Sequence, residues 1–225
     1  MTRSGPSGWT IERWRSLGHI DFDPSNFEGR EGYFLLTSLV VPRPIAWVST
    51  VSPDGARNLA PHSYFNAISS NPLVIHFTST GEKDTLRNVK ATGEFVVNIV
   101  SAPLAEVMNL TAANFPAEED EFAWANLEDA PSKTIVPPRV ARAAAAFECT
   151  VNRIVSIGSG NMVFGNVTHL VVDEAVMRDG RVAPDLLDAV GRLGGSWYTR
   201  AATDLFKMKR PTYDDVKTKS GERAG

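Results

Sequence analysis

The sequence predicts a mainly β protein, a barrel or a sandwich with a few helices at its edges. Two long segments, 147–157 and 162–172, alternate apolar and polar residues, as strands with one buried face do. The glycine-containing turn 158–161 joins them as a hairpin. Helical periodicity, by contrast, is confined to short stretches, so strands are expected to dominate the fold.

Further strands are expected in the first half of the chain. Residues 43–51 are rich in aromatic and β-branched side chains and run into a turn-forming Ser-Pro-Asp-Gly. A hairpin partner is expected at 57–62. Two more strand candidates, 65–69 and 73–79, are separated by Asn71-Pro72. A nearly all-apolar strand at 95–100 is expected to be buried on both faces.

Three helices are expected between and after these strands. In the first, 83–91, Leu86 and Val89 are three apart and Gly93 ends the helix. The second covers 104–111 and places its apolar side chains on one face. A third helical stretch is expected at 184–190.

A length of 225 residues suits a single domain, which we place at 31–210. Residues 1–30 are polar and broken by glycine and proline, so they are expected to form an arm, with a short helix at 10–17. The polar tail 211–225 is expected to be poorly ordered. The irregular segment 112–140 is too long for a bare connection and is either a lid over a site or a surface excursion.

Composition excludes several classes of protein. The formal net charge is -3, so no basic surplus supports nucleic-acid binding. No apolar run approaches a membrane span, and the N-terminal residues lack the apolar stretch of a signal peptide. The single cysteine, Cys149, can form no intrachain disulfide, which favours a cytoplasmic protein. Because Cys149 lies in an alternating segment, a core role is favoured over a redox role.

The chain shows few chemical motifs of other enzyme classes. None of His19, His62, His76 and His169 pairs with another at metal-ligand spacing, so no metal site is expected. His76 is interpreted as a strand histidine with satisfied ring nitrogens. Residues 158–165 superficially resemble a dinucleotide fingerprint, but the third glycine is misplaced and the turn joins two strands. The acidic run at the start of 118–124 is interpreted as a solvated face.

Three segments in a fixed order carry a family resemblance. They are Arg-Pro-Ile-Ala-Trp-Val-Ser-Thr at 43–50, Asn-Leu-Ala-Pro-His-Ser-Tyr-Phe-Asn at 58–66 and Lys-Asp-Thr at 83–85. Segments 93–98 and 191–195 extend the match. From about residue 33 to 210 the chain resembles the flavin reductase-like, FMN-binding split-barrel family. The resemblance implies a six-stranded Greek-key split β-barrel with peripheral helices, and a homodimer with FMN near the subunit interface.

The resemblance also implies a cofactor site. Its residues are Ala46, Trp47, Val48, Ser49 and Thr50 beside the ring and ribityl chain, Ser63, Tyr64 and Phe65 as a second wall, Lys83, Asp84 and Thr85 at the phosphate, and Tyr198 near the flavin from the same or the neighbouring subunit. The chemistry is suitable, because Lys83 and the free N–H groups of a helix start attract a phosphate. The hydroxyl groups of Ser49 and Thr50 suit ribityl and phosphate oxygens.

Alternatives remain open for single residues. Trp47 fits the core or an interface better than a stacking position. His62 could contact the flavin or the nicotinamide, or only close a strand. Arg192 could pair with an acidic neighbour. The glycines before Tyr198 permit close backbone approach. His62 and Tyr198 are the candidate catalytic residues, although the hydride step itself needs no strong acid or base.

The expected function is that of an FMN-dependent oxidoreductase. It would take hydride from NADH or NADPH onto flavin N5 and pass electrons to free flavin, a flavin-dependent monooxygenase or another acceptor. One alternative is an FMN-binding electron-transfer protein, flavoredoxin-like, without direct NAD(P)H oxidation. Another is a flavin-dependent transformation of a small organic substrate, with 118–124 as a specificity lid.

Overall fold

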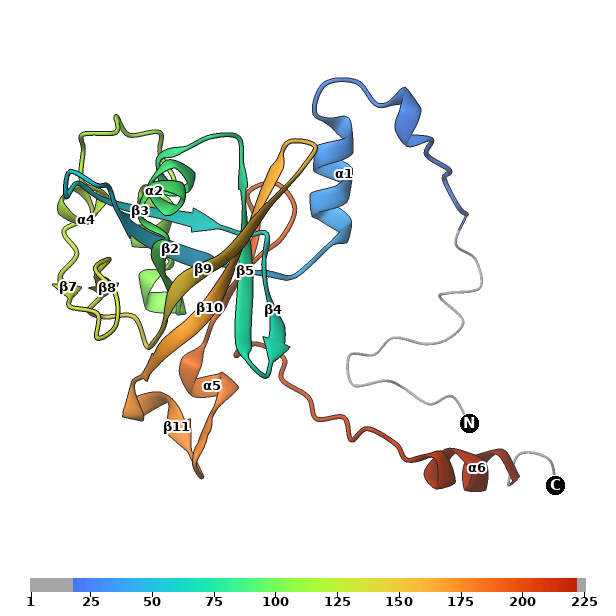
Figure 1. Ribbon diagram of the computed structural model, residues 1–225. Coiled ribbons are helices and arrows are strands. Elements are labelled where there is room, and N and C mark those ends of the chain that lie inside the picture. Colours follow the sequence, from blue (N-terminus) through green and yellow to red (C-terminus); the bar gives the residue numbers. More distant parts are fainter. Residues whose placement is uncertain (1–17, 222–225) are drawn as a thin grey trace.

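In the computed structural model, which describes residues 18–221, one antiparallel sheet forms the body of the protein (Figure 1). Its strands lie in the order β3 (Arg57–His62), β2 (Ala46–Val51), β6 (Glu94–Ile99), β9 (Ala145–Ile157), β10 (Gly160–Val172), β5 (Leu73–Thr80) and β4 (Phe65–Ser70). All strands expected from the residue pattern are therefore present, and the mainly β class is confirmed. The helix expected at 10–17 lies outside the described residues.

The sheet differs from the expected six-stranded split barrel in its number of strands. It has seven strands rather than six, and within residues 18–221 no ladder joins its edge strands β3 and β4. The reason is the connection through Ser63 and Tyr64, which takes the chain from pairing with β2 to pairing with β5. The sheet is consequently open between two strands that are consecutive in the sequence.

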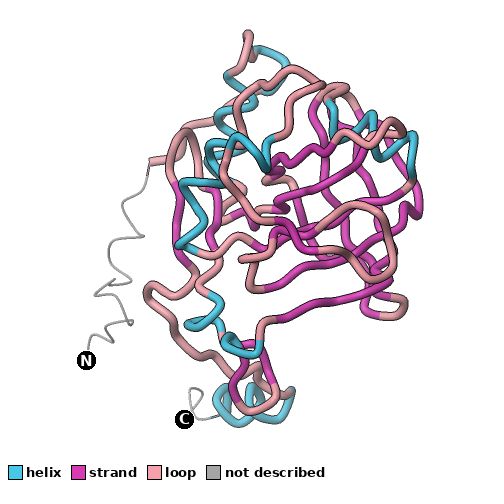
Figure 2. The backbone as a smooth tube through the Cα atoms, turned by 90° about the vertical axis from the view of Figure 1, so that its left-hand side faces the viewer, coloured by secondary structure: helices cyan, strands magenta, loops and turns pink. Residues whose placement is uncertain are grey.

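The helices are short, and most of them lie at the edges of the sheet (Figure 2). They are the 3-10 turns Pro24–Asn26, Ala102–Leu104 and Glu174–Val176, and the helices α1 (Glu31–Leu39), α2 (Asp84–Thr92), α3 (Ala105–Leu110), α4 (Glu121–Trp124), α5 (Pro184–Leu187) and α6 (Tyr213–Gly221). The helix expected at 83–91 is confirmed as α2, which Gly93 ends at a φ of 73°. The turn at 102–104 and α3 together confirm the helix expected at 104–111.

Three helical expectations need correction. Helix α1 was not expected. Helix α5 is shorter than 184–190, because Asp188 adopts a left-handed conformation with φ 42° and ends it. Helix α6 occupies the tail that was expected to be poorly ordered, at the end of an extended segment apart from the main sheet (Figure 1). No helix among the described residues is long and apolar enough to cross a membrane.

Smaller sheets complete the fold. They are β1 (Arg43–Pro44) with β13 (Val190–Arg192) and β14 (Tyr198–Arg200), β7 (Asp129–Ala130) with β8 (Arg139–Val140), and β11 (Met177–Arg178) with β12 (Arg181–Val182). The first of them matters for the site, because it pairs Pro44 with Gly191. Two segments of the family resemblance thereby become neighbours.

The central strand β2 is buried on both faces. Ala46 and Val48 belong to an apolar cluster that contains Phe77, and Trp47 belongs to a second cluster on the opposite face. Cys149 lies fully buried in the first cluster, and burial raises the pKa of its thiol far above the usual value. The expected core role of Cys149 is therefore confirmed.

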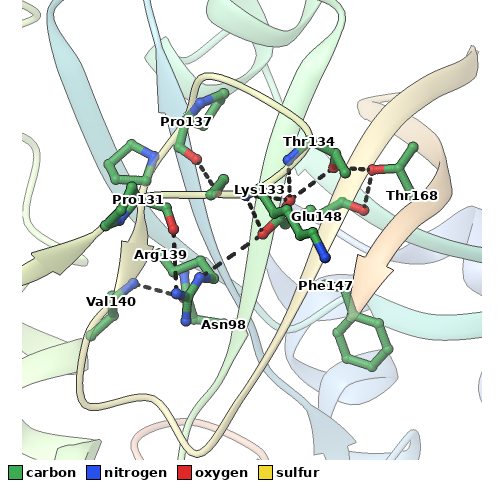
Figure 3. Close-up of polar contacts among 12 residues, drawn as sticks. Asn98, Pro131, Lys133, Thr134, Pro137, Arg139, Val140, Phe147, Glu148 and Thr168 are labelled. Carbon is green, nitrogen blue, oxygen red and sulfur yellow. Dashed lines mark hydrogen bonds and ion pairs between the residues drawn. The ribbon is translucent and has the colours of Figure 1, made fainter. Parts of the chain in front are cut away.

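A buried carboxylate holds the irregular segment against the sheet (Figure 3). Glu148 on β9 is fully buried and accepts hydrogen bonds from the backbone N–H groups of Lys133 and Thr134 at 2.8–2.9 Å. Burial acts to raise the pKa of Glu148, but these bonds outweigh it and lower the pKa below its usual value. Nearby, Asn98 on β6 accepts from the Val140 N–H at 2.9 Å. The segment around 131–140 is thus fixed to the sheet.

Candidate functional site

A groove of two adjoining compartments lies at the opening between β3 and β4. The first compartment, about 370 Å³, lies between the end of β3, strand β5, the start of α2 and residues 111–115. The second compartment, about 390 Å³, lies between α1, β1 and residues 192–198. The two share a wall that includes Tyr33, Pro61 and Ser63. Each has the size of a small-molecule site.

The structure brings about half of the expected site residues together. Those that line the first compartment are His62, Ser63, Tyr64, Lys83, Asp84 and Thr85. Tyr198 lines the second compartment. Phe65 lines neither compartment and packs against the apolar cluster around Phe77.

The five residues of β2 that were expected beside the flavin lie outside both compartments. Ala46, Trp47, Val48, Ser49 and Thr50 are all fully buried and line neither compartment. Their polar groups are already used, since Ser49 Oγ donates to the Pro138 carbonyl and Trp47 Nε1 donates to Thr111 Oγ1 at 2.9 Å. The physical reason is that β2 is a central strand with neighbours on both sides and side chains packed over both faces. These residues support the groove from behind.

Thr50 illustrates this supporting role. Its hydroxyl oxygen accepts hydrogen bonds from Asn58 Nδ2 at 3.3 Å and from Asn88 Nδ2 at 3.1 Å. Asn58 also donates to Thr85 Oγ1 at 3.0 Å. This buried network connects β2 and β3 to α2, and it fixes the first turn of the helix at the edge of the first compartment.

The start of α2 is suited to an anion. Lys83 precedes the helix without a capping side-chain bond, and the first backbone N–H groups donate to no acceptor among residues 18–221. The Lys83 ammonium has no ion pair or hydrogen bond within the described chain. Arg87 follows one turn later, where it pairs with Asp84. Positive charge, free donors and the helix dipole therefore meet at one end of the compartment.

His62 is a buried, neutral side chain in the same compartment. Burial and the nearby Lys83 charge lower its pKa to about 4, despite a hydrogen bond to the backbone of Thr78. Its Nε2 is buried and has no partner among the described residues. A neutral ring of this kind orients a ligand and carries no charge near pH 7. His76 also departs from expectation, since its buried Nδ1 has no partner within residues 18–221.

Two hydroxyl groups that line the first compartment are free to bind a ligand. The side chains of Ser63 and Tyr64 line the first compartment and form no hydrogen bond within the described part of the chain. Burial, followed by the neighbouring Tyr33, raises the pKa of Tyr64, so its phenol stays protonated. Both groups can donate to a bound oxygen or accept from a bound N–H.

The segment 112–140 contributes to the wall at its beginning. Ala112 and Phe115 line the first compartment, and so does Glu121. Glu121 is buried and accepts from the Leu59 N–H at 3.0 Å, while burial raises the pKa of its carboxyl group. Asp120 pairs with Arg57. The interpretation of the acidic run as a solvated face is therefore wrong for two of its members, which anchor α4 to β3.

Close backbone approach shapes the second compartment. A Cβ on Gly194 would lie 3.1 Å from the Ser38 Cα, so only glycine lets the 191–195 segment pack against α1. Arg43 ties the two together, donating to the carbonyls of Val40 at 2.7 Å and Leu193 at 2.9 Å. The close approach thus packs this segment against α1.

Arg192 and Tyr198 form a pair in this compartment. The Arg192 guanidinium lies over the Tyr198 ring, 4.5 Å from its centroid, and donates to the phenol oxygen. The phenol in turn donates to Asn109 Oδ1 at 3.0 Å. Within the described part of the chain, Arg192 thus pairs with a tyrosine and a backbone carbonyl and not with an acidic residue.

Several groove residues were missed in the sequence. Arg87 could have been found, because a residue four positions after Lys83 lies on the same face of a helix. Thr78 and Thr80 line the first compartment together, as the period of two in a strand predicts. Tyr33 could not have been found, since α1 itself was not expected.

Comparisons with known proteins agree with this geometry. The family model described as flavin reductase-like domain matches residues 38–194. Nitrilotriacetate monooxygenase component B of Bacillus cereus is 32% identical, with a TM-score of 0.83 over 86% of this chain and 100% of that one. The 2-nitrobenzoate 2-nitroreductase of Pseudomonas fluorescens is 34% identical, with a TM-score of 0.80 over 86% and 98%. An FMN-binding protein of Thermus thermophilus shares the fold, at 18% identity and a TM-score of 0.69 over 85% and 99%.

Proposed function

The chain belongs to the flavin reductase-like domain family, and from this membership we propose that it is an FMN-dependent oxidoreductase. In this proposal NADH or NADPH donates the hydride. The electrons then pass to free flavin, a partner monooxygenase or another acceptor. The observation that carries the proposal is the pair of adjoining, ligand-sized compartments with a common wall.

The first compartment fits FMN by the chemistry of its free groups. Lys83 and the uncapped start of α2 would hold the phosphate, because they supply positive charge and N–H donors that have no acceptor in the described chain. The hydroxyls of Ser63 and Tyr64 and the ring of His62 would meet the polar edge of the flavin. When bound, FMN supplies the hydride-accepting ring and the ability to pass electrons on.

The second compartment would admit the other reactant. Its shared wall with the first, at Tyr33, Pro61 and Ser63, would bring the two ligands into contact. Holding two rings together in this way is worth several kcal/mol, about 7–11 in well-oriented systems. No side chain at the wall needs to transfer a proton, and neutral His62 and protonated Tyr64 serve to orient the ligands.

Two relatives of similar sequence support a redox role. One is a component of nitrilotriacetate monooxygenase, and the other is a nitroreductase. Both exceed 30% identity over most of this chain. We propose an enzyme over a simple electron carrier for this reason, and because a carrier has no use for a second small-molecule compartment.

The proposed assembly is a homodimer. Helix α1 beside the groove presents a row of exposed apolar side chains, namely Tyr33, Phe34, Leu36 and Leu39, and Val40 and Val41 follow it. An apolar surface of this kind on a soluble domain is typical of an interface. A second copy that covers α1 would also close the outer side of the second compartment, which α1 lines.

Rapid mixing of FMN-loaded protein with NADH or NADPH tests the proposed function. We expect the flavin absorption band to bleach within the catalytic time scale and to recover when an acceptor is added. Bleaching only by a reduced partner protein would instead identify an electron carrier. Failure to bind FMN would overturn the proposal as a whole.

A further inference from the structure

The second compartment has an unusual charge distribution. Three arginines, Arg30, Arg43 and Arg192, line it, and within residues 18–221 no Asp or Glu does. None of the three forms an ion pair with a carboxylate in the described part of the chain. The protein as a whole carries a formal charge of -3, so this concentration of positive charge is local.

Arg43 is the most informative of the three. Its side chain is only 6% exposed, and its hydrogen-bond partners are the neutral carbonyls of Thr37, Val40 and Leu193. Its Nε is buried and has no partner within the described chain. A buried cation without a counterion is costly, and an anion placed in the adjoining compartment would offset that cost.

Arg192 and Arg30 can contact such an anion directly. Two of the five N–H groups of Arg192 are used, on Tyr198 Oη and on the Gly195 carbonyl, and the others have no acceptor in residues 18–221. The Arg30 side chain forms no hydrogen bond in the same range, and its guanidinium lies over the rings of Tyr33 and Phe34, 4.8 and 5.0 Å from their centroids. A planar guanidinium of this kind suits the two oxygens of a carboxylate.

Aromatic rings supply the other half of the recognition. Tyr33, Phe34 and Tyr198 line the same compartment as the arginines. Rings of this kind pack against a flat ring of the ligand, while the guanidinium groups bind its charged end. The volume of about 390 Å³ suits a ligand with one or two rings.

We propose that the second compartment binds an aromatic carboxylate, with Arg192 and Arg30 on the carboxylate and the three aromatic side chains around the ring. Arg43 contributes long-range attraction from within the wall. The proposal rests on the proposed function only in that the ligand would lie beside FMN across the shared wall. It therefore defines a small-molecule class for that function.

Calorimetric titration of the FMN-loaded protein with three probes tests the proposal. Benzoate carries both the ring and the charge, benzamide keeps the shape without the charge, and cyclohexanecarboxylate keeps the charge without the flat ring. We expect benzoate to bind at least about tenfold more tightly than either of the others. Equal binding of the three probes, or no binding of benzoate, would overturn the proposal.

Variants locate the binding. Arg192→Gln and Arg30→Gln are each expected to weaken benzoate about tenfold, and Arg192→Lys is expected to restore part of the loss. The Arg30 side chain forms no hydrogen bond within residues 18–221, so its variant keeps the test valid if Arg192→Gln folds poorly. Arg153→Gln, an exposed change on β9 outside both compartments, is the matched control. Equal effects in the control and the two test variants would contradict the proposal.

Two further outcomes separate the hypotheses. Benzoate binding that depends on Arg192, in protein that fails to bind FMN, would overturn the proposed function and leave this inference standing. FMN and NADPH binding with no response to benzoate would overturn the inference alone. It would assign the arginines to the phosphates of the dinucleotide.

Discussion

Burial decides the chemistry of the groove at the level of single residues. Ser49 and Thr50 carry suitable hydroxyls, but both are committed to neighbours inside the protein. The side chains of Ser63, Tyr64 and Lys83 are uncommitted and line the first compartment. Ligand-binding capacity therefore resides in the groups that the fold leaves without partners, and not in those of the most recognisable segment.

His62 should make stability depend on pH. Its pKa is about 4 in the folded protein and near 6.5 in the unfolded chain, so the unfolded state binds more protons between these values. The stabilisation is fully present above pH 6.5 and is lost as the pH falls toward 4. We expect the free energy of unfolding to fall by about 2 kcal/mol more between pH 7 and pH 5 in the wild type than in His62→Gln. Urea unfolding at both pH values measures this difference.

His19→Gln serves as the control for this experiment, because His19 is exposed and lines neither compartment. We expect the pH dependence of unfolding in this control to match that of the wild type. If His62→Gln also matched the wild type, the buried neutral state of His62 would be contradicted.

At the level of elements, one carboxylate stabilises a long irregular segment. Glu148→Gln keeps the size of the side chain but replaces one accepting oxygen with an amide group that faces the N–H donors of Lys133 and Thr134. We expect a loss of about 3 kcal/mol in the free energy of unfolding, and earlier proteolysis within 131–140. Chemical denaturation and limited proteolysis measure the two effects.

Glu118→Gln is the matched control for Glu148→Gln, since Glu118 is exposed and forms no hydrogen bond within the described chain. Its stability should remain within about 0.5 kcal/mol of the wild type. Equal stability of the two variants would mean that the buried bonds of Glu148 contribute nothing.

The predictable elements are those whose burial follows their periodicity. The residues of β9 and β10 alternate between apolar and polar, which identifies the two strands in the sequence. Helix α2 buries Leu86 and Val89, which are three positions apart, and ends at a glycine, so it too can be recognised. Helix α1 is not, because its large apolar residues are mostly exposed and only Thr37 is buried. A helix that buries so little within its own chain has no core-facing stripe to detect.

The candidate site could be predicted only in part for a related reason. The positions 62–64 and 83–85 lie at element ends, where the side chains of Ser63, Tyr64 and Lys83 and the first N–H groups of α2 have no partner among residues 18–221. In the sequence, the hydroxyls of Ser49 and Thr50 look as available to a ligand as the hydroxyl of Ser63. These two hydroxyls form hydrogen bonds inside the protein because β2 lies between β3 and β6. The pairing of β2 with β6 joins residues far apart in the sequence, so the local pattern does not reveal it.

At the level of the whole molecule, the apolar surface of α1 predicts self-association. We expect a mass twice the 24.5 kDa of one chain in sedimentation or light-scattering experiments. Leu39→Lys, at a position 71% exposed in the single chain, should shift the equilibrium to the monomer. Val136→Lys, at a position 74% exposed but far along the chain in the 131–140 segment, should leave the dimer intact.

A monomeric wild type would contradict the proposed assembly. So would a Leu39→Lys variant that stays dimeric while Val136→Lys dissociates, because that result would place the interface on the other side of the molecule.

The central claim is that the start of α2 binds the phosphate of the flavin, and titration of apo-protein with FMN and with riboflavin tests it most directly. Riboflavin lacks the phosphate, so the wild type should bind FMN more tightly, and Lys83→Gln should lose at least about tenfold in FMN affinity with little change for riboflavin. Lys133→Gln, the same change at an exposed site outside the groove, should behave as wild type. Unchanged FMN affinity in Lys83→Gln, or equal wild-type affinity for the two flavins, would contradict the account.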